Sequence, residues 1–141
     1  MRVLVVNGPN LNLLGTRRVE VYGEQTLPEL EMRCRSWAAD LGLEADTFQS
    51  NHEGALIDRL HDAVGRYGGI VINPGALTHY SYALHDAIEA VGIPTVEVHL
   101  SDITTREEWR AHSVVSPACL ATISGDGAEG YRRALEMLAR R

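Results

Sequence analysis

The stretch GGIVINPGALTHYSYALHDAIEAVGIPTVEVHL, residues 68–100, contains a complete strand–helix–strand pattern. Short apolar runs at 68–73 and 94–100 are rich in β-branched residues, which favour strands. Between them, apolar residues recur at the three- and four-residue spacing of a helix with one buried face. These residues are Leu84, Ala87, Ile88 and Val91. The stretch therefore predicts two parallel strands joined by a helix that covers the sheet.

The same alternation continues through the rest of the chain. Thr26 and Glu29 form a capping-box pattern at the start of a helix, and 101–118 is irregular apart from a helical turn at 106–110. Strands are expected at 2–7, 43–49, 68–73, 94–100 and 119–124, and helices at 26–42, 53–67, 81–91 and 127–141. The second of these helices is expected to bury Leu56, Ile57, Leu60, Val64 and Tyr67. This order predicts an α/β fold of flavodoxin-like size, a five-stranded parallel sheet with helices on both faces.

Length and composition are those of one ordinary globular domain, expected to span residues 1–141. The chain is 45% hydrophobic and 23% charged, and its net charge of -6 argues against nucleic acid or an anionic membrane as a partner. No apolar run approaches the length of a membrane span, and the start MRVLVVNG has no leader pattern. Cys34 and Cys119 lack metal-site spacing and are interpreted as reduced thiols. We therefore expect a cytoplasmic protein.

The strand at 94–100 carries two titratable side chains on one face. Side chains alternate along a strand, so Glu97 and His99 point the same way. A buried carboxylate needs partners, and two interpretations supply them. In one, Glu97 accepts a ring N–H of His99 and leaves the other nitrogen for proton transfer. In the other, both residues join His79 as ligands of a zinc ion. The spacing does not separate these alternatives.

Polar side chains also follow the other strands. Ligands of parallel α/β sheets bind at the carboxyl ends of the strands, where Asn7 and Asn10 follow the first strand and Asn73 and His79 the third. The G-x-G-x-x-G spacing at 125–130 follows the last strand instead of the first, and we interpret it as a turn before a helix. No cofactor motif remains, so no cofactor is expected.

Six motifs along the chain resemble, in order, those of the type II 3-dehydroquinate dehydratases. They are NGPNLNLLG, VYG, QSNHEG, INPGALTHYSYALHDAI, VEVHLS and WRAHS, and the resemblance extends from Val3 to the helix that starts in GDGAEGY. It implies a flavodoxin-like fold, a homododecamer built as a tetramer of trimers, and no metal or organic cofactor. It also implies 3-dehydroquinate as the substrate. The expected reaction is anti elimination of water through an enolate to 3-dehydroshikimate, in the shikimate pathway of aromatic amino-acid biosynthesis.

The resemblance implies catalytic roles for five residues. Tyr22 matches the base that takes the proton next to the ketone, and Arg17 matches the cation that lowers the proton affinity of this base. Asn10 matches the residue that stabilises the enolate oxygen. His99 matches the general acid that protonates the departing hydroxyl, and Glu97 matches the carboxylate that orients it.

Further positions match the family's substrate-binding residues. Asn73, His79 and Arg110 match residues that bind substrate hydroxyls. The backbone N–H groups of Leu100 and Ser101 match those that bind the substrate carboxylate. The resemblance thus predicts that the substrate lies across the ends of the third and fourth strands.

Asp86 matches a residue that reaches the site of a neighbouring subunit. Four positions depart from the family pattern: Val19 replaces a proline, His85 an arginine, Asp102 an asparagine and Ala111 a histidine. The added negative charge of Asp102 is expected to change affinity and not chemistry. The remaining histidines, His52, His61, His85 and His112, are interpreted as surface residues.

Two other functions are compatible with the predicted fold. A binding module without catalysis explains the polar loops but gives no reason for Tyr22, Arg17, Asn10 and His99 to occur together. A metal-dependent hydrolase that uses His79, Glu97 and His99 lacks an obvious base to activate water.

Overall fold

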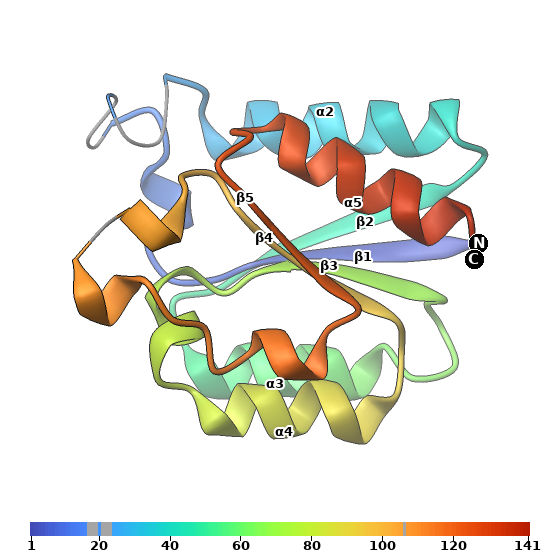
Figure 1. Cartoon of the computed structure of the whole chain (residues 1–141). Helices are drawn as coiled ribbons and strands as arrows, with labels where there is room; N and C mark the ends of the chain where they lie inside the picture. The colour runs from blue at the N-terminus through green and yellow to red at the C-terminus, as the bar shows by residue number, and fades with distance from the viewer. Residues whose placement is uncertain (17–19, 21–23, 106) are drawn as a thin grey trace.

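A computed structural model describes residues 1–16, 20, 24–105 and 107–141 of the chain. Within them, five parallel strands form one sheet, and four helices of ten residues or more pack against it (Figure 1). The strands are β1 (Arg2–Asn7), β2 (Glu44–Gln49), β3 (Gly69–Asn73), β4 (Thr95–His99) and β5 (Ala121–Ser124). The helices are α2 (Leu27–Asp40), α3 (Glu53–Asp62), α4 (Tyr82–Val91) and α5 (Glu129–Ala139). The predicted α/β fold is confirmed.

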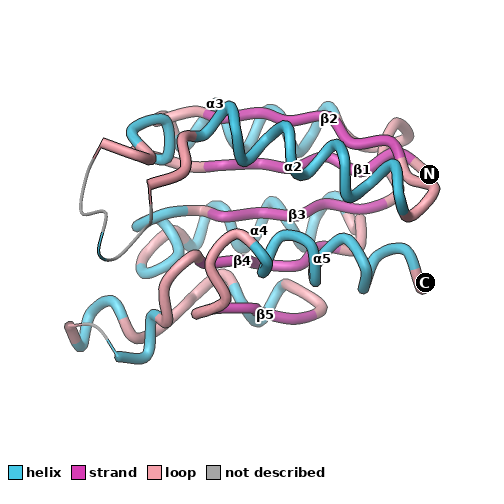
Figure 2. Tube along the Cα trace, turned by 90° about the horizontal axis from the view of Figure 1, so that it is seen from above, coloured by secondary structure: helices cyan, strands magenta, loops and turns pink. Residues whose placement is uncertain are grey.

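The order of the strands in the sheet is β2-β1-β3-β4-β5 (Figure 2). The chain moves from β1 to one neighbour, β2, and then crosses to β3 on the other side of β1. The register pairs Asn7 with Asn73, so the last residues of β1 and β3 lie side by side. The order of the strands along the chain therefore reverses its direction between β1 and β3. Ligands of parallel α/β sheets bind at such a point.

Each face of the sheet is covered by its own pair of helices (Figure 1). Helices α2 and α5 pack over a cluster that includes Val3, Val71 and Val98. Helices α3 and α4 pack on the other face over a cluster that includes Leu4 and Ile72. Because both faces are buried, β1 and β3 are almost continuously apolar up to their final asparagines.

Local sequence signals agree with the helix starts. The Oγ1 atom of Thr26 accepts the backbone N–H of Glu29 at 3.4 Å and donates to its carboxylate at 2.9 Å, so α2 begins at the predicted capping pattern. Ser81 caps α4 by accepting the N–H of Leu84 at 3.0 Å. Among the described residues, no helix is both long and apolar enough to cross a membrane.

Two expectations were wrong. Helix α3 ends at Asp62 and the chain turns at Gly65, which has a φ of 78°, so Val64 is 56% exposed instead of buried. His85, interpreted as a surface residue, is half-buried, and its Nδ1 lies 2.7 Å from the carbonyl of Val114.

Candidate active site

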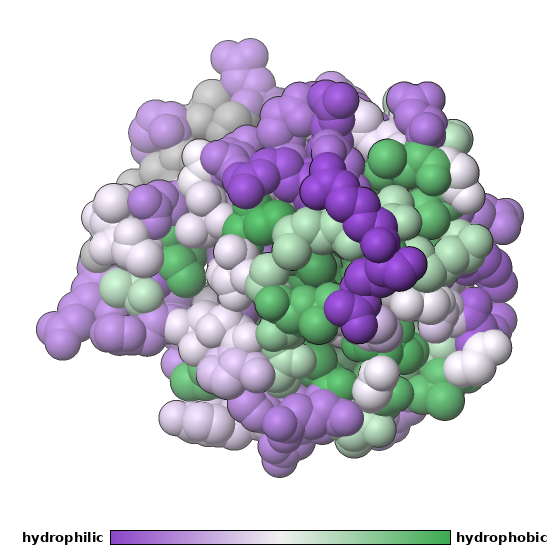
Figure 3. Space-filling model, turned by 45° about the vertical axis from the view of Figure 1, so that its right-hand side comes forward, coloured by the Kyte–Doolittle hydropathy of each residue, from purple (hydrophilic) through white to green (hydrophobic). Residues whose placement is uncertain are grey.

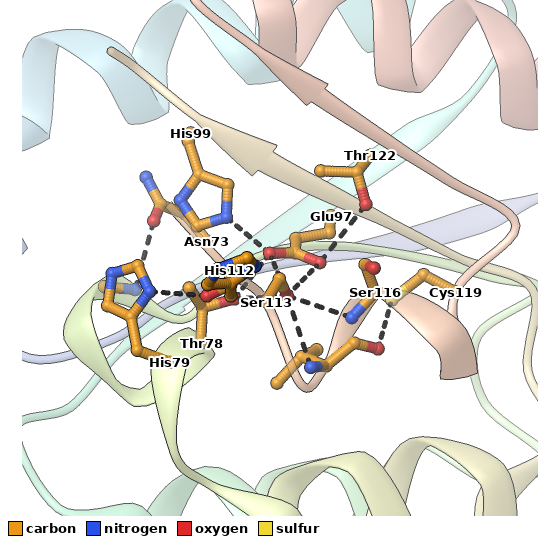
Figure 4. Close-up of polar contacts among 12 residues, drawn as sticks. Asn73, Thr78, His79, Glu97, His99, His112, Ser113, Ser116, Cys119 and Thr122 are labelled. Atoms are coloured by element: carbon orange, nitrogen blue, oxygen red, sulfur yellow. Dashed lines mark hydrogen bonds and ion pairs between the residues drawn. The ribbon is translucent and has the colours of Figure 1, made fainter. Parts of the chain in front are cut away.

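Strand β4 ends in a buried carboxylate and a buried imidazole, Glu97 and His99 (Figure 4). Glu97 is fully buried, and His99 is 6% exposed. The Nε2 atom of His99 is in hydrogen-bonding contact with Oε2 of Glu97. Because Nε2 is engaged, Nδ1 is the ring nitrogen left to exchange a proton with a ligand. This is the geometry of a proton-transfer group held by an orienting carboxylate.

Three hydroxyl groups surround the Glu97 carboxylate (Figure 4). Thr78 donates to Oε2 at 2.5 Å, Ser113 lies 3.0 and 2.9 Å from the two oxygens, and Thr122 donates to Oε1 at 3.3 Å. Burial by itself raises the pKa of Glu97. The hydrogen bond and charge of His99, together with the hydroxyls of Thr78 and Ser113, outweigh burial and hold the pKa of Glu97 below its usual value. Glu97 is therefore an anion at neutral pH.

The loops that follow β1, β3 and β4 enclose a cavity beside His99. Its volume of about 120 Å³ has room for on the order of ten water-sized groups. Such a space fits a small molecule. Most of the predicted site residues line this cavity: Asn10, Asn73, His79, His99, Leu100, Ser101 and Arg110.

The exposed ring of Trp109 contacts two of these residues. It meets the ring of His79 edge-on at 5.4 Å and lies 4.1 Å from the guanidinium carbon of Arg110. The Nδ1 atom of His79 donates to the carbonyl of His112 at 2.7 Å, and Nε of Arg110 lies 2.9 Å from the carboxylate of Glu107. Burial lowers the pKa of His79 and outweighs the opposing hydrogen bond to the carbonyl. His79 is therefore neutral at neutral pH.

The zinc interpretation of His79, Glu97 and His99 is wrong for this arrangement. Glu97 already accepts hydrogen bonds from hydroxyls and an imidazole, and Nδ1 of His79 is bound to a backbone carbonyl. Within the described part of the chain, the His, Cys, Asp and Glu side chains close enough to share an ion form one group on α4 that includes Asp86. That group does not line the cavity.

A buried tyrosine connects the carboxyl ends of β1 and β3. The hydroxyl of Tyr131 in α5 accepts a hydrogen bond from Nδ2 of Asn73 at 2.9 Å and donates to Oδ1 of Asn7 at 2.6 Å. The Oδ1 atom of Asn73 accepts the backbone N–H of Gly75 at 3.1 Å. Both ends of the Asn73 carboxamide are thus fixed before a ligand binds.

The backbone of Asn10 has a φ of 71°, which is uncommon for a residue other than glycine. Its N–H donates to Oδ1 of Asn51 at 2.9 Å, and the same oxygen accepts Nε2 of Gln49 at 3.1 Å. Gln49 also donates to the carbonyl of Gly8 at 3.2 Å. These contacts hold the loop after β1 in the conformation that brings Asn10 to the cavity.

The remaining sequence predictions concern Arg17, Tyr22 and Asp86. Arg17 and Tyr22, the predicted cation and base, lie outside the described residues, as does Val19. Their predicted roles stay predictions. Asp86 is exposed on α4 and does not line the cavity of its own chain.

The hydroxyl partners of Glu97 that lie far from it in the chain were not predicted from the sequence. A carboxylate in a buried strand signals that donors are needed. No sequence pattern near Glu97, however, shows that Ser113 and Thr122 supply these donors. The position of Tyr131 in the apolar spacing of its helix likewise indicates burial and not the partners of its hydroxyl.

The fold and the site are those of an α/β enzyme with a buried carboxylate–imidazole pair beside a small-molecule cavity at the carboxyl edge of its sheet. The sequence model of the family described as "Dehydroquinase class II" matches residues 1–139. The chain belongs to this family, as the resemblance of its motifs predicted.

Individual relatives cover nearly the whole chain. A 3-dehydroquinate dehydratase of Gloeobacter violaceus is 55% identical over 139 residues, which are 99% of this chain and 87% of that protein. A catabolic 3-dehydroquinase of Verticillium alfalfae is 52% identical and covers 99% of this chain and 93% of its own. The crystal structure of the type II dehydroquinase from Butyrivibrio crossotus has a TM-score of 0.96 at 46% identity and covers 98% of this chain and 97% of its own.

Proposed function

We propose that this chain eliminates water from 3-dehydroquinate to give 3-dehydroshikimate, as a hydro-lyase of the shikimate pathway. One observation carries the proposal: in a chain of the class II dehydroquinase family, a buried Glu97–His99 pair lies at the edge of a cavity for a small molecule. The reaction needs a base for one proton and an acid for the departing hydroxyl, and no cofactor is proposed.

In the first step, the phenolate of Tyr22 takes the proton from the carbon next to the ketone and leaves an enolate. A tyrosine with an ordinary pKa of about 10 is protonated at neutral pH, so a nearby cation is needed. Arg17, five residues earlier, is proposed to supply it. Asn10 stabilises the oxygen on which the enolate charge develops. The presence of Asn10 beside the cavity supports this part of the proposal.

In the second step, His99 protonates the departing hydroxyl through Nδ1. The enolate electron pair forms the carbon–carbon double bond, the carbon–oxygen bond breaks, and water leaves. The Glu97 anion holds the ring through Nε2 and so leaves Nδ1 facing the substrate. Tyr22 has then gained a proton and His99 has lost one, so proton exchange with solvent completes the cycle.

The substrate is proposed to bind across the ends of β3 and β4. Asn73, His79 and Arg110 contact its hydroxyls, and the backbone N–H groups of Leu100 and Ser101 bind its carboxylate. All five residues line the cavity, which supports this assignment. Because Nδ1 of His79 is already bound to a carbonyl, Nε2 is the nitrogen available to the substrate.

The active form is proposed to be a cytoplasmic homododecamer, a tetramer of trimers, in which Asp86 contributes to the site of a neighbouring subunit. Asp86 is exposed and outside its own cavity, which fits such a role. Large exposed side chains support burial of surface between copies: Tyr80, Tyr82, Trp109 and Leu120 are each at least 47% exposed. Figure 3 shows hydrophobic residues gathered in the middle of one face of the molecule, with hydrophilic side chains across them.

Ultraviolet absorbance tests the proposed reaction, because the product is a conjugated enone and the substrate is not. We expect absorbance to rise when the protein is mixed with 3-dehydroquinate, and to rise far more slowly with Glu97→Gln or His99→Ala. A His61→Ala variant, altered at an exposed histidine, is the matched control and should react like the wild type. No change at high enzyme concentration would contradict the proposal and favour a binding module.

A further inference from the structure

We propose that Ser113 is a positioning residue for this reaction, because its hydroxyl can only donate to Glu97 and thereby keeps Glu97 the acceptor in its hydrogen bond with Nε2 of His99. The inference rests on the proposed function and deepens it. Ser113 lies in the irregular segment between β4 and β5, next to the residue whose carbonyl binds His79. Figure 4 shows it between the Glu97 carboxylate and the following turn.

The backbone around Ser113 fixes the direction of its hydroxyl proton. Its Oγ atom accepts the N–H of Val115 at 3.2 Å and the N–H of Ser116 at 3.0 Å. A hydroxyl has two lone pairs and one proton, so these contacts occupy both lone pairs. The proton is left for the Glu97 oxygens, which lie 3.0 and 2.9 Å away. Ser113 can therefore donate to Glu97 and cannot accept a proton from it.

This hydrogen bond bears on where the proton of the buried pair resides. Hydrogen bonds donated to a carboxylate favour its charged form. Because Ser113 can only donate, it lowers the affinity of Glu97 for the proton on Nε2 of His99. If the proton moved from His99 to Glu97, the ring would become a neutral imidazole, which is a much weaker acid for the departing hydroxyl.

Thr78 is a less restricted donor to the same carboxylate. Its Oγ1 atom lies 2.5 Å from Oε2 of Glu97 and 3.0 Å from Oγ of Ser113. Among the described residues, no backbone N–H donates to Oγ1 of Thr78, whereas two donate to Oγ of Ser113. Of these two neighbours, Ser113 is thus the one whose geometry prevents it from accepting the proton of Glu97.

The test compares four variants in the full-length protein. Ser113→Ala removes the donor, Ser113→Cys replaces it with a weak donor of similar shape, and Ser113→Thr retains a hydroxyl. Ser116→Ala is the matched control, because it keeps the backbone N–H that binds Ser113. Steady-state kinetics with 3-dehydroquinate give kcat and KM, infrared difference spectra report a protonated carboxyl group, and thermal melting checks folding.

We expect kcat of Ser113→Ala to fall roughly tenfold to a hundredfold, the value of a hydrogen bond to a charged group, with KM nearly unchanged. The carboxyl band should appear in Ser113→Ala and be absent when Glu97→Gln is added. Ser113→Cys should lie between Ser113→Ala and the wild type, whereas Ser113→Thr should retain most of the wild-type rate. If Ser113→Ala does not fold, Ser113→Cys decides the question.

Wild-type kcat in a folded Ser113→Ala or Ser113→Cys variant would overturn the inference, as would a loss of kcat without the carboxyl band. Failure of the proposed function gives a different result. In that case Glu97→Gln and His99→Ala would keep wild-type turnover, or the wild type itself would not react.

Discussion

Replacing Tyr131 with phenylalanine tests how the carboxyl ends of β1 and β3 are held together. The substitution keeps the buried ring and removes only a hydroxyl that bonds Asn73 at 2.9 Å and Asn7 at 2.6 Å. Asn73 is 3% exposed and Asn7 is fully buried, so water does not replace the lost contacts freely. A buried polar group without a partner costs about 1–3 kcal/mol. Two such groups cost about 2–6 kcal/mol, with the lower end applying if the two carboxamides bond each other.

Urea unfolding at one fixed protein concentration measures this loss, because assembly makes stability depend on concentration. Ser36→Ala is the control: it also removes one hydroxyl, but from an exposed residue of α2, and it should stay within about 0.5 kcal/mol of the wild type. KM should also rise in Tyr131→Phe, since Asn73 loses one of the contacts that fix its carboxamide. Equal stability of Tyr131→Phe and Ser36→Ala would refute the assigned role of this hydroxyl.

Three further predictions concern metal, assembly and acid. Exhaustive chelation should leave turnover intact because the chemistry is assigned to Glu97 and His99, and activity lost on chelation and restored by zinc would contradict this. Light scattering should find an assembly larger than a monomer, and Asp86→Ala should lower turnover; an active monomer at micromolar concentration would refute both expectations. Folding lowers the pKa of Glu97, so its stabilising effect is present above the ordinary value of 4.5 and lost as pH falls below it. When the pH is lowered from 7 into the acid range, the urea midpoint of unfolding should therefore fall less for Glu97→Gln than for the wild type. Equal falls in the two proteins would contradict this prediction.

The fold follows from the sequence because buried parallel strands and one-sided helices have different apolar periods. The run at 68–73 and the stripe that includes Leu84 and Ile88 both correspond to elements of the structure. The prediction failed at Val64, because the apolar spacing of the helix continues there in the sequence although the chain turns at Gly65. Apolar spacing alone does not mark where a helix ends.

The candidate site is only partly visible in the sequence. The alternation of side chains along β4 predicted that Glu97 and His99 share one face, and in the structure the two side chains are in contact. The hydroxyl of Ser113, by contrast, reaches Glu97 from 16 residues away through an irregular segment. Contacts of this kind depend on how loops close after the sheet has formed, and no periodic pattern records them.

The central claim is that Tyr22 is the base and His99 is the general acid. Deuterium exchange tests this claim most directly. Unreacted 3-dehydroquinate is followed by NMR in deuterated solvent with Tyr22→Phe and with His99→Ala. If Tyr22 takes the α-proton, Tyr22→Phe should abolish both exchange and turnover. His99→Ala should still exchange the proton while elimination slows by about 10²–10⁴-fold, the usual effect of a positioned acid. Exchange that survives in Tyr22→Phe but is lost in His99→Ala would contradict the account and make His99 the base.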